Sequence, residues 1–483
     1  MFSLRWSTLV MLVVCALSES GHCDDPAPTH EQAEAALWRA CSFFREQVSC
    51  QGGYLWRYSA DLTKREGEGR ADERTVWVQP PGTPSVGQAL LDVYQRIGDQ
   101  RYLDLAHDAG RCLVRGQLRS GGWDYRIAFA PEGRRRYAYR VEEDVAPKAR
   151  NVTTLDDNTT QAALTLLMRL DEALDFQDAE IHEAVEFGLS ALLAAQYPNG
   201  AWPQRFTEPP NPDQFPVRKA NYPASWSREF PGTSYSGFYT FNDNAIADII
   251  DVFFLAERTY DQPRYRQAAE KAGDFILSAQ MSAPQPGWAQ QYNAEMQPAW
   301  ARKFEPPSIT GGEAAGVLRT LIRLYQETGE ERFLKPIPLA LEYYRASVLP
   351  GGGLARFYEL KTNRPLFFTR DYELTYDDSD MPTHYAFKVG NWVDSVARQY
   401  ERALASGPIG PSPSASPRPP QLTKSLERQA SSIIDSLDER GAWVESGRLK
   451  YHGEDDDTRE VIDCRTFIKN IRVLATYLAA TGS

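Results

Sequence analysis

Two short stretches of the sequence gather oxygen-bearing side chains immediately before an apolar helical pattern. Residues 153–160 carry Asp156 and Asp157, and residues 239–244 carry Asp243 between two asparagines. Carboxylate and amide oxygens are the ligands of hard cations such as calcium, which takes roughly six to eight of them. The two stretches could therefore form one oxygen-rich cation site. They could equally be two ordinary helix N-caps, because acidic groups are favourable at a helix N-terminus.

Cationic and aromatic residues gather further along the chain. Arg302 and Lys303 are adjacent, with aromatic residues on both sides and a Pro-Pro pair after them. A later stretch, residues 355–371, includes the charged residues Arg356, Arg364, Arg370 and Asp371. The planar guanidinium group matches a carboxylate, and the whole chain has a net charge of −12, so this local positive excess predicts a pocket for a carboxylate-bearing ligand. The alternative is that these charges flank solvated loops.

The elements that must position these residues form a degenerate helical repeat. Ala163, Leu167, Leu170 and Leu174 recur at helical spacing and define one buried face. Helices that run into a Gly-rich turn and an aromatic or polar loop recur, with turns at residues 119–124, 195–204, 279–290, 349–356 and 439–443. This long, irregular period favours a ring of helical hairpins over a tetratricopeptide or HEAT array. We predict an all-α fold, an incomplete α/α barrel or toroid whose loops form a cleft, with a few short strands.

The composition also divides the chain into segments. Residues 1–22 contain one positive charge, a short apolar core and small residues, which predicts a secretory signal peptide. Residues 27–405 would form the toroid, and residues 406–420 are a Pro- and Ser-rich linker. Residues 421–483 predict a further helical hairpin that is too small to be stable alone and docks on the toroid.

Irregular segments and weak strand patterns lie within the toroid. Residues 125–129 and 354–360 alternate enough to predict short strands. Residues 130–152 and 205–236 are long and rich in proline, and segments of this kind are usually functional or disordered.

Charge and cysteine content exclude several classes of protein. A net charge of −12 provides no basic field for nucleic acid, and no segment after the signal peptide is apolar for long enough to span a membrane. The sequence has no CxxC or HExxH motif, so a zinc site is not expected. The cysteines are too sparse for a disulfide framework, although Cys41 and Cys50 could pair. We expect a secreted or periplasmic monomer.

Six motifs, in order between residues 80 and 395, resemble those of the family 10 polysaccharide lyases, the pectic acid lyases. They are Thr-Leu-Asp-Asp-Asn-Thr-Thr (154–160), Gly-Ala-Trp-Pro-Gln (200–204), Phe-Asn-Asp-Asn-Ala (241–245), Trp-Ala-Gln-Gln-Tyr (288–292), Ala-Arg-Lys-Phe-Glu-Pro-Pro-Ser (301–308) and Arg-Phe-Tyr-Glu-Leu-Lys-Thr-Asn-Arg-Pro (356–365). The resemblance implies an α/α toroid that cleaves polygalacturonate by β-elimination and uses calcium.

The same resemblance assigns roles to individual residues. It makes Asp156, Asp157 and Asp243 calcium ligands and Arg302 the catalytic base. The residues expected to bind substrate are Lys303, Trp202, Arg356, Arg364, Arg370, Asp371 and Tyr385. Free guanidinium loses its proton only above about pH 12. An arginine base therefore requires a cationic, desolvated setting, here expected from Lys303 and calcium, and alkaline activity should follow.

The sequence also departs from the family pattern. Asp157 stands where the family has Asn, and residues 288–292 lack a Cys and a His of the family segment. Residues 304–308 differ from the family's Tyr-Glu-Leu-Pro-Ser, and residues 380–385 lack a substrate-binding arginine. The function predicted is a secreted pectate lyase. The alternatives are a glycoside hydrolase acting on uronic-acid oligosaccharides, with Asp156 and Asp243 as its acid–base pair, and a non-catalytic sugar-binding homologue.

Overall fold

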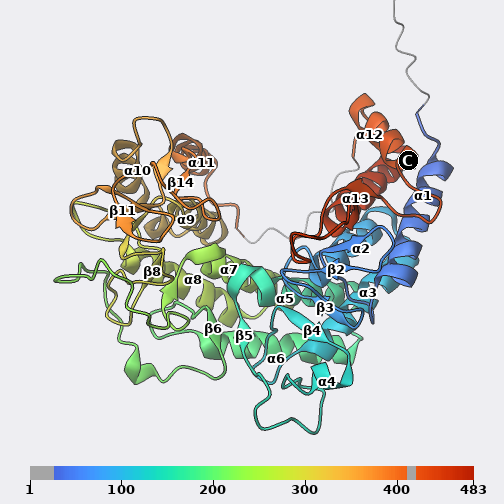
Figure 1. The fold of residues 1–483 in the computed structure, drawn as a ribbon, viewed down its shortest axis with the longest axis horizontal. Helices are drawn as coiled ribbons and strands as arrows, with labels where there is room; N and C mark the ends of the chain where they lie inside the picture. Colours follow the sequence, from blue (N-terminus) through green and yellow to red (C-terminus); the bar gives the residue numbers. More distant parts are fainter. Residues whose placement is uncertain (1–26, 411–419, 483) are drawn as a thin grey trace, which may run out of the picture.

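The computed structural model describes residues 27–410 and 420–482, and its helices pack as hairpins in an open arc (Figure 1). The predicted signal peptide and most of the predicted linker lie outside the described residues. The α-helices are α1 (His30–Phe43), α2 (Thr83–Ile97), α3 (Gln100–Gly116), α4 (Pro131–Arg134), α5 (Thr159–Ala173), α6 (Ala179–Ala195), α7 (Ala245–Tyr260), α8 (Pro263–Ala279), α9 (Ala314–Thr328), α10 (Ile337–Ala346), α11 (Val393–Ser406), α12 (Lys424–Asp435) and α13 (Cys464–Thr481).

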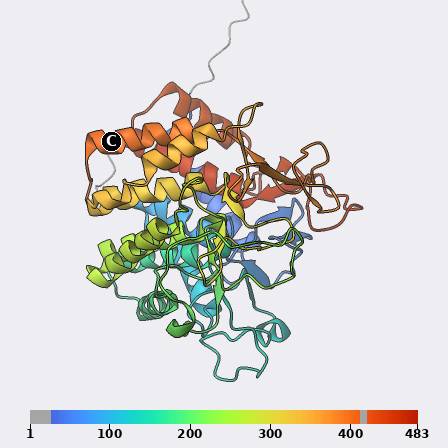
Figure 2. The same cartoon turned by 90° about the vertical axis from the view of Figure 1, so that its left-hand side faces the viewer.

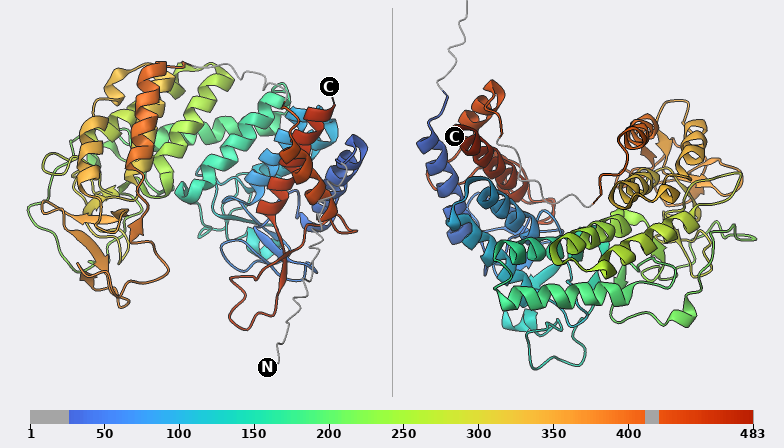
Figure 3. Two further views of the ribbon diagram at one scale, coloured as in Figure 1. Left: turned by 90° about the horizontal axis from the view of Figure 1, so that it is seen from above. Right: turned by 180° about the vertical axis from the view of Figure 1, so that it is seen from behind.

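One layer of the arc runs through helices that pack side by side in the order α13, α2, α5, α7, α9 and α11. The hairpin partners α3, α6 and α8 pack behind α2, α5 and α7. The two arms of the arc do not close into a ring (Figures 1 and 3). The prediction of a helix-rich, incomplete α/α toroid is therefore confirmed. Among residues 27–410 and 420–482, every helix is too short or too polar to be a candidate membrane span.

Short strands gather at one end of the helices (Figure 2). They are β1 (Arg57–Ser59), β2 (Arg65–Glu66), β3 (Thr75–Trp77), β4 (Arg126–Ala128), β5 (Thr153–Thr154), β6 (Arg205–Phe206), β7 (Tyr239–Thr240), β8 (Gln291–Tyr292), β9 (Ser308–Thr310), β10 (Leu354–Ala355), β11 (Phe357–Glu359), β12 (Pro365–Phe368), β13 (Leu374–Thr375), β14 (Lys388–Val389), β15 (Glu445–Ser446) and β16 (Glu460–Asp463). The predicted strands at 125–129 and 354–360 are confirmed by β4, β10 and β11.

The strands form small antiparallel sheets that fix the loops at this end of the arc. One sheet has the order β15-β16-β1-β2 and another the order β13-β12-β11-β9. β5 pairs with β6 and β7 pairs with β8, with Thr153 opposite Phe206 and Tyr239 opposite Tyr292. A strand precedes each helix of the α13–α2–α5–α7–α9–α11 layer, so the N-termini of these helices all lie near the sheets.

The recurring Gly-rich turns have a structural role that explains the repeat. In four of them a buried tryptophan ring donates its N–H to a backbone carbonyl of the preceding helix. The pairs are Trp123 with Leu113, Trp202 with Leu192, Trp288 with Ile276 and Trp443 with Ile433, at 2.8 to 2.9 Å. Each ring therefore closes the end of one hairpin against its own helix, which satisfies the polar N–H inside the core.

Glutamines at the ends of three helices join neighbouring hairpins. The side-chain amide of Gln117 donates to the carbonyls of Gly121 in its own turn and Ala184 in α6, at 2.9 and 2.8 Å. Gln196 and Gln280 make the equivalent bonds one hairpin further along, to carbonyls of Ala268 and Pro336. These side chains set the spacing between successive hairpins, because each one satisfies carbonyls on two of them.

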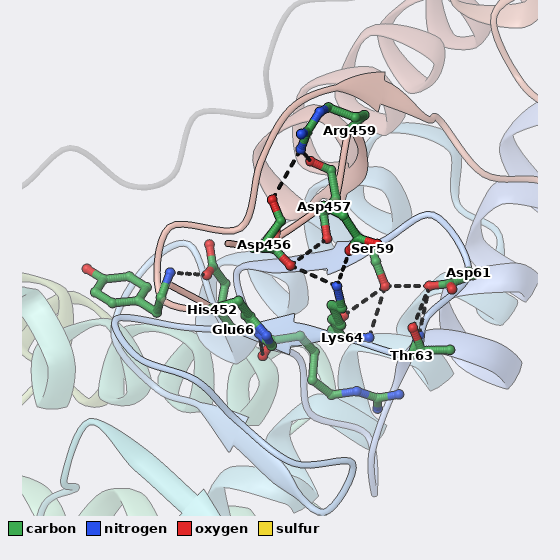
Figure 4. A network of polar contacts seen from close by, with 12 residues as sticks. Ser59, Asp61, Thr63, Lys64, Glu66, His452, Asp456, Asp457 and Arg459 are labelled. Atoms are coloured by element: carbon green, nitrogen blue, oxygen red, sulfur yellow. Dashed lines mark hydrogen bonds and ion pairs between the residues drawn. The ribbon is translucent and has the colours of Figure 1, made fainter. Parts of the chain in front are cut away.

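The C-terminal hairpin packs against the N-terminal arm. α13 contacts α1 and α2, and the ring of Phe467 stacks on that of Phe44 with centroids 3.5 Å apart. β16 pairs with β1, and Arg57 forms an ion pair with Asp463 at 2.8 Å. A polar network fixes the loop before β16, in which Lys64 Nζ contacts carboxylates of residues 456 and 457 at 2.8 and 2.6 Å (Figure 4).

Candidate active site

The two acidic stretches have the same unusual backbone. In the one-turn segments η2 (Asp156–Asn158) and η4 (Asn242–Asn244), the last two residues both adopt the left-handed conformation. The φ angles are 50° and 56° at Asp157 and Asn158, and 51° and 57° at Asp243 and Asn244. This conformation costs non-glycine residues roughly 1–2 kcal/mol each. Such strain is commonly found where a side chain has a functional position to hold.

The simple N-cap interpretation does not account for these stretches. Asn158 and Asn244 occupy the N-cap positions of α5 and α7, but neither side chain accepts a hydrogen bond from the helix. η2 and η4 instead pack against each other, because α5 and α7 are neighbours in the arc. The kinks thus turn the acidic side chains toward one another.

Asp156, Asp157 and Asp243 come together as an acidic triad. Each contributes one carboxylate oxygen to a group in which all oxygens lie within 4.8 Å of one another. Asp156, which is only 9% exposed, accepts hydrogen bonds from Tyr125 at 2.7 Å and Gln204 at 2.9 Å. This arrangement agrees with the prediction that residues 153–160 and 239–244 could form one oxygen-rich site.

The electrostatics of the triad favour a bound cation. Burial and the charge of Asp156 raise the pKa of Asp157 to about 7 and that of Asp243 to about 6. The charge of Asp156 thus makes Asp157 and Asp243 harder to ionise. A hard divalent ion would relieve this repulsion, and an all-oxygen donor set is the kind that calcium takes. The residues present therefore fit calcium.

Arg302 lies beside the triad, and its charge is among those that act on Asp157 and Asp243. Its guanidinium group forms a two-point ion pair with buried Glu305, with Nε–Oε2 and Nη2–Oε1 distances of 2.8 and 2.5 Å. Glu305 also accepts hydrogen bonds from Gln290 at 2.8 Å. Both carboxylate oxygens of Glu305 therefore accept hydrogen bonds, and this carboxylate covers one side of the arginine.

The charge state of Arg302 corrects one sequence-based expectation. A cationic setting was expected to favour the neutral guanidine, with Lys303 as one source. Burial does act to lower the pKa of Arg302, but the hydrogen bonds and charge of Glu305 outweigh it and raise that pKa. Lys303 lies elsewhere, with its ammonium group 3.5 Å from the centre of the Tyr372 ring. Arg302 is therefore held as a cation in this structure.

Tyr385 connects Arg302 to a second arginine. Its hydroxyl donates to Glu305 at 2.9 Å, and the guanidinium carbons of Arg302 and Arg356 both lie near its ring, 5.5 and 4.7 Å from the ring centre. Arg356 also forms an ion pair with Glu313 at 2.8 Å. Burial raises the pKa of Glu313 to about 7, although Arg356 opposes the shift. Arg302, Arg356 and Tyr385 thus form one cluster.

Two carboxylates of this cluster were missed by sequence reasoning. Glu305 lies within the motif at 301–308, and its spacing of three from Arg302 was the available signal. Glu313 precedes α9 directly, and nothing local distinguishes it from a helix-start glutamate. Both position arginines by ion pairs.

Other predicted substrate-binding residues lie apart from the cluster. Trp202 is 1% exposed, packs on Phe253 and donates to the carbonyl of Leu192, so its prediction as a substrate contact is wrong. The guanidinium carbon of Arg364 lies 3.4 Å from the centre of the Tyr376 ring. Two further residues are exposed: Arg370, which pairs with Asp380 at 3.2 Å, and Asp371.

Comparison with known proteins identifies the family that part of this chain resembles. Residues 133–352 match the family model described as pectic acid lyase, a segment that contains the acidic triad and Arg302. This segment is that of a polysaccharide lyase. More narrowly, residues 133–352 belong to the pectic acid lyases, and the resemblance drawn from the motifs is confirmed.

Solved structures with similar folds include a family 10 polysaccharide lyase from Cellvibrio cellulosa, with 21% identity, 66% of this chain and 97% of that chain covered, and a TM-score of 0.45. A mutant of that enzyme in complex with trigalacturonic acid gives the same identity, TM-score and coverage of this chain, with 98% of that chain covered. A family 76 glycoside hydrolase, a mannosidase, from Bacteroides thetaiotaomicron is 11% identical over 94% of this chain and 98% of that chain, with a TM-score of 0.42. A search of curated proteins found no match.

Proposed function

We propose that the protein is a calcium-dependent pectate lyase that cleaves polygalacturonate by β-elimination. The observation that carries the proposal is the convergence of three carboxylates, within 4.8 Å of one another, beside Arg302 in a pectic acid lyase segment. Carboxylates alone would repel a polyuronate. A site that pairs an acidic triad with arginines suits a substrate carboxylate that arrives together with a cation.

β-Elimination explains the residue types. The reaction removes the proton on C5 of a uronate, forms the C4–C5 double bond and breaks the bond between C4 and the glycosidic oxygen, which takes a proton from solvent. Calcium, held by Asp156, Asp157 and Asp243, would supply Lewis-acid stabilisation of the negative charge that develops at the C6 carboxylate. Tyr125, Gln204 and Gln79 orient the ligand carboxylates through hydrogen bonds of 2.7 to 2.9 Å.

Arg302 is the residue that we propose as the base. Its charge lowers the pKa of Asp157 and Asp243, and its ion pair with Glu305 fixes the plane of its guanidinium group. Arg205, the other arginine at the triad, is already paired with Asp156 at 3.5 Å. The ion pair also keeps it protonated in the free enzyme, since arginine is normally charged in proteins. A competent base form is therefore scarce at neutral pH, and activity should rise steeply toward alkaline pH.

The remaining residues that the family resemblance assigns to substrate binding, except Trp202, are proposed to bind substrate. Arg356 and Tyr385 adjoin Arg302, and a uronate carboxylate could compete with Glu313 for Arg356. Lys303, Arg364, Arg370 and Asp371 are exposed near the same strands and would contact sugars further along the polymer. We also propose a secreted or periplasmic monomer, on the basis of the N-terminal sequence and the polymeric substrate.

The test is an ultraviolet assay for the C4–C5 double bond on polygalacturonate, with calcium and with a chelator. Absorbing product that disappears with the chelator and with Asp243→Ala supports the proposal. Reducing sugar without absorbance would identify a hydrolase instead. Binding of oligogalacturonate with neither product would identify a sugar-binding protein and overturn the proposal.

A further inference from the structure

A second cationic surface lies outside the pectic acid lyase segment, between α2 and α13. A pocket of about 560 Å³ there is lined by Pro81, Ser85 and Gln88 from the start of α2 and by Arg465, Lys469 and Arg472 from α13. None of its lining residues is acidic. The pocket thus carries a local excess of positive charge in a chain of net charge −12.

The cations are arranged along one face of a rigid helix. Arg465, Lys469 and Arg472 are spaced by four and three residues, which places them in one row on α13. Arg465 and Lys469 are exposed, and neither side chain forms an ion pair with any residue in the described part of the chain. They are thus available to an anionic ligand.

The third cation of the row is held in place by a shared acid. Arg472 contacts Asp92 with Nε and Nη2 at 2.8 and 2.7 Å. The same carboxylate group also accepts from Arg169 at 2.7 Å. One acid serves two arginines, so the surroundings of the pocket remain positive.

One turn of the chain connects the acidic triad with the pocket. The side chain of Gln79 donates to Asp157 Oδ2 at 2.8 Å, and Pro81, two residues later, lines the pocket. α13 lies on the side of its arm that faces the opposite arm (Figures 1 and 3). The turn that leads into α2 offers a path along which a long ligand bound at the triad could extend toward the pocket.

We propose that this pocket is a distal subsite that binds carboxylates of the same polyuronate chain whose bond is cleaved at the triad. The proposal rests on the proposed function and extends it to a part of the chain that the family match does not cover. A polyuronate carries one carboxylate per sugar, so Arg465 and Lys469 would each meet an anion. Pro81, Ile468 and Val473 supply apolar surface for the sugar faces.

A distal subsite makes the affinity depend on polymer length. Contacts at a second site add to affinity only when one ligand molecule spans both sites. Polygalacturonate would gain from the pocket, whereas a trimer bound at the triad would not reach it. The C-terminal hairpin would thus set the preference for long substrates.

The experiment compares Arg465→Gln/Lys469→Gln with a matched control, Lys424→Gln/Arg428→Gln. Both variants lose two positive charges spaced by four residues, and the control residues are exposed on α12, outside the pocket. We expect KM for polygalacturonate to rise roughly fivefold or more in the pocket variant, with kcat and all trimer kinetics unchanged. The control should match the wild type, and thermal unfolding should show that both variants are folded.

A KM that is unchanged in the pocket variant, or that rises equally for the trimer, would overturn the proposal. If the wild type shows no lyase activity, the proposed function fails and the pocket is then tested by retention in a gel that contains polygalacturonate. Weaker retention of the pocket variant alone would support the subsite, and equal retention of both variants would overturn it.

Discussion

The ion pair between Arg302 and Glu305 decides which charge the proposed base carries. Glu305 is 1% exposed, and burial alone would raise its pKa, but Arg302 and its hydrogen-bond donors lower that pKa below the usual range. The pair is therefore ionised on both sides in the free protein. Removing one partner should change the other in a direction that can be measured.

Glu305→Gln is expected to shift the pH dependence of catalysis. Without the carboxylate, burial still lowers the pKa of Arg302 while the opposing interaction is lost. If Arg302 is the base, the alkaline rise of kcat/KM moves to lower pH, and Arg302→Ala reduces kcat by roughly 100- to 10,000-fold. An unmoved profile in Glu305→Gln would show that Arg302 acts only as a cation. Gln preserves the hydrogen bond from Tyr385, which makes it the appropriate replacement.

Calcium should stabilise the protein more at alkaline than at acidic pH. The pKa values of Asp157 and Asp243, about 7 and 6, lie above the usual 3.8, so ionising them without a cation costs the folded state stability as pH rises through this range. Bound calcium removes that cost, but protons compete with it at low pH. The increase in Tm on adding calcium should be large at pH 8 and small at pH 5. Asp157→Asn should reduce this difference, and equal increases at both pH values would contradict the proposed metal site.

At the scale of the elements, hairpins are joined by a few buried side chains at their turns. The residue types in these turns were visible in the sequence, but their purpose was not. A tryptophan after a Gly-rich turn has the same sequence pattern whether it stacks on a sugar or closes a hairpin, and Trp202 does the second. Local pattern cannot decide this, because burial depends on the neighbouring hairpin.

Gln117→Leu should destabilise the fold without touching the site. Gln117 is fully buried, and its loss leaves the carbonyls of Gly121 and Ala184 without their donor. We expect a loss of roughly 1–3 kcal/mol in the free energy of unfolding, measured by urea denaturation. Gln177→Leu is the control, since Gln177 is exposed and bonds only within its own loop. Equal effects of the two substitutions would show that Gln117 does not join the hairpins.

The helices and the acidic triad were predictable for a physical reason. Helical spacing of Ala163, Leu167 and Leu170 reflects burial on one face, and this signal is local. Asp156 and Asp243 were paired because both open a helix of the same repeat. Glu313 was not found, because its partner Arg356 lies 43 residues away and their contact depends on how β9 and β11 pair.

At the scale of the whole molecule, the C-terminal hairpin is part of the N-terminal arm. α13 packs on α1 and α2, and β16 lies between β15 and β1. Composition indicated a separate hairpin after a linker but could not indicate where it docks, since that contact joins residues more than 400 positions apart, such as Arg57 and Asp463.

Cutting the chain within residues 411–419 should leave the molecule in one piece. A protease site inserted there separates residues 420–482 from the rest covalently, but α13 and β16 keep their contacts with the N-terminal arm. We expect the cut protein to elute as one species on size exclusion under native conditions and to separate only in denaturant. Elution of a free C-terminal fragment would contradict this packing.

The stacking of Phe467 on Phe44 also determines when the protein can fold during synthesis. Until the last helix has left the ribosome, the apolar faces of α1 and α2 that it covers have no partner. The first arm of the arc is thus the first to be translated and the last to be completed, and exposed apolar surface of this kind promotes aggregation. A nascent chain that stays incompletely folded in this way also remains open to translocation and to chaperones until its final residues are made.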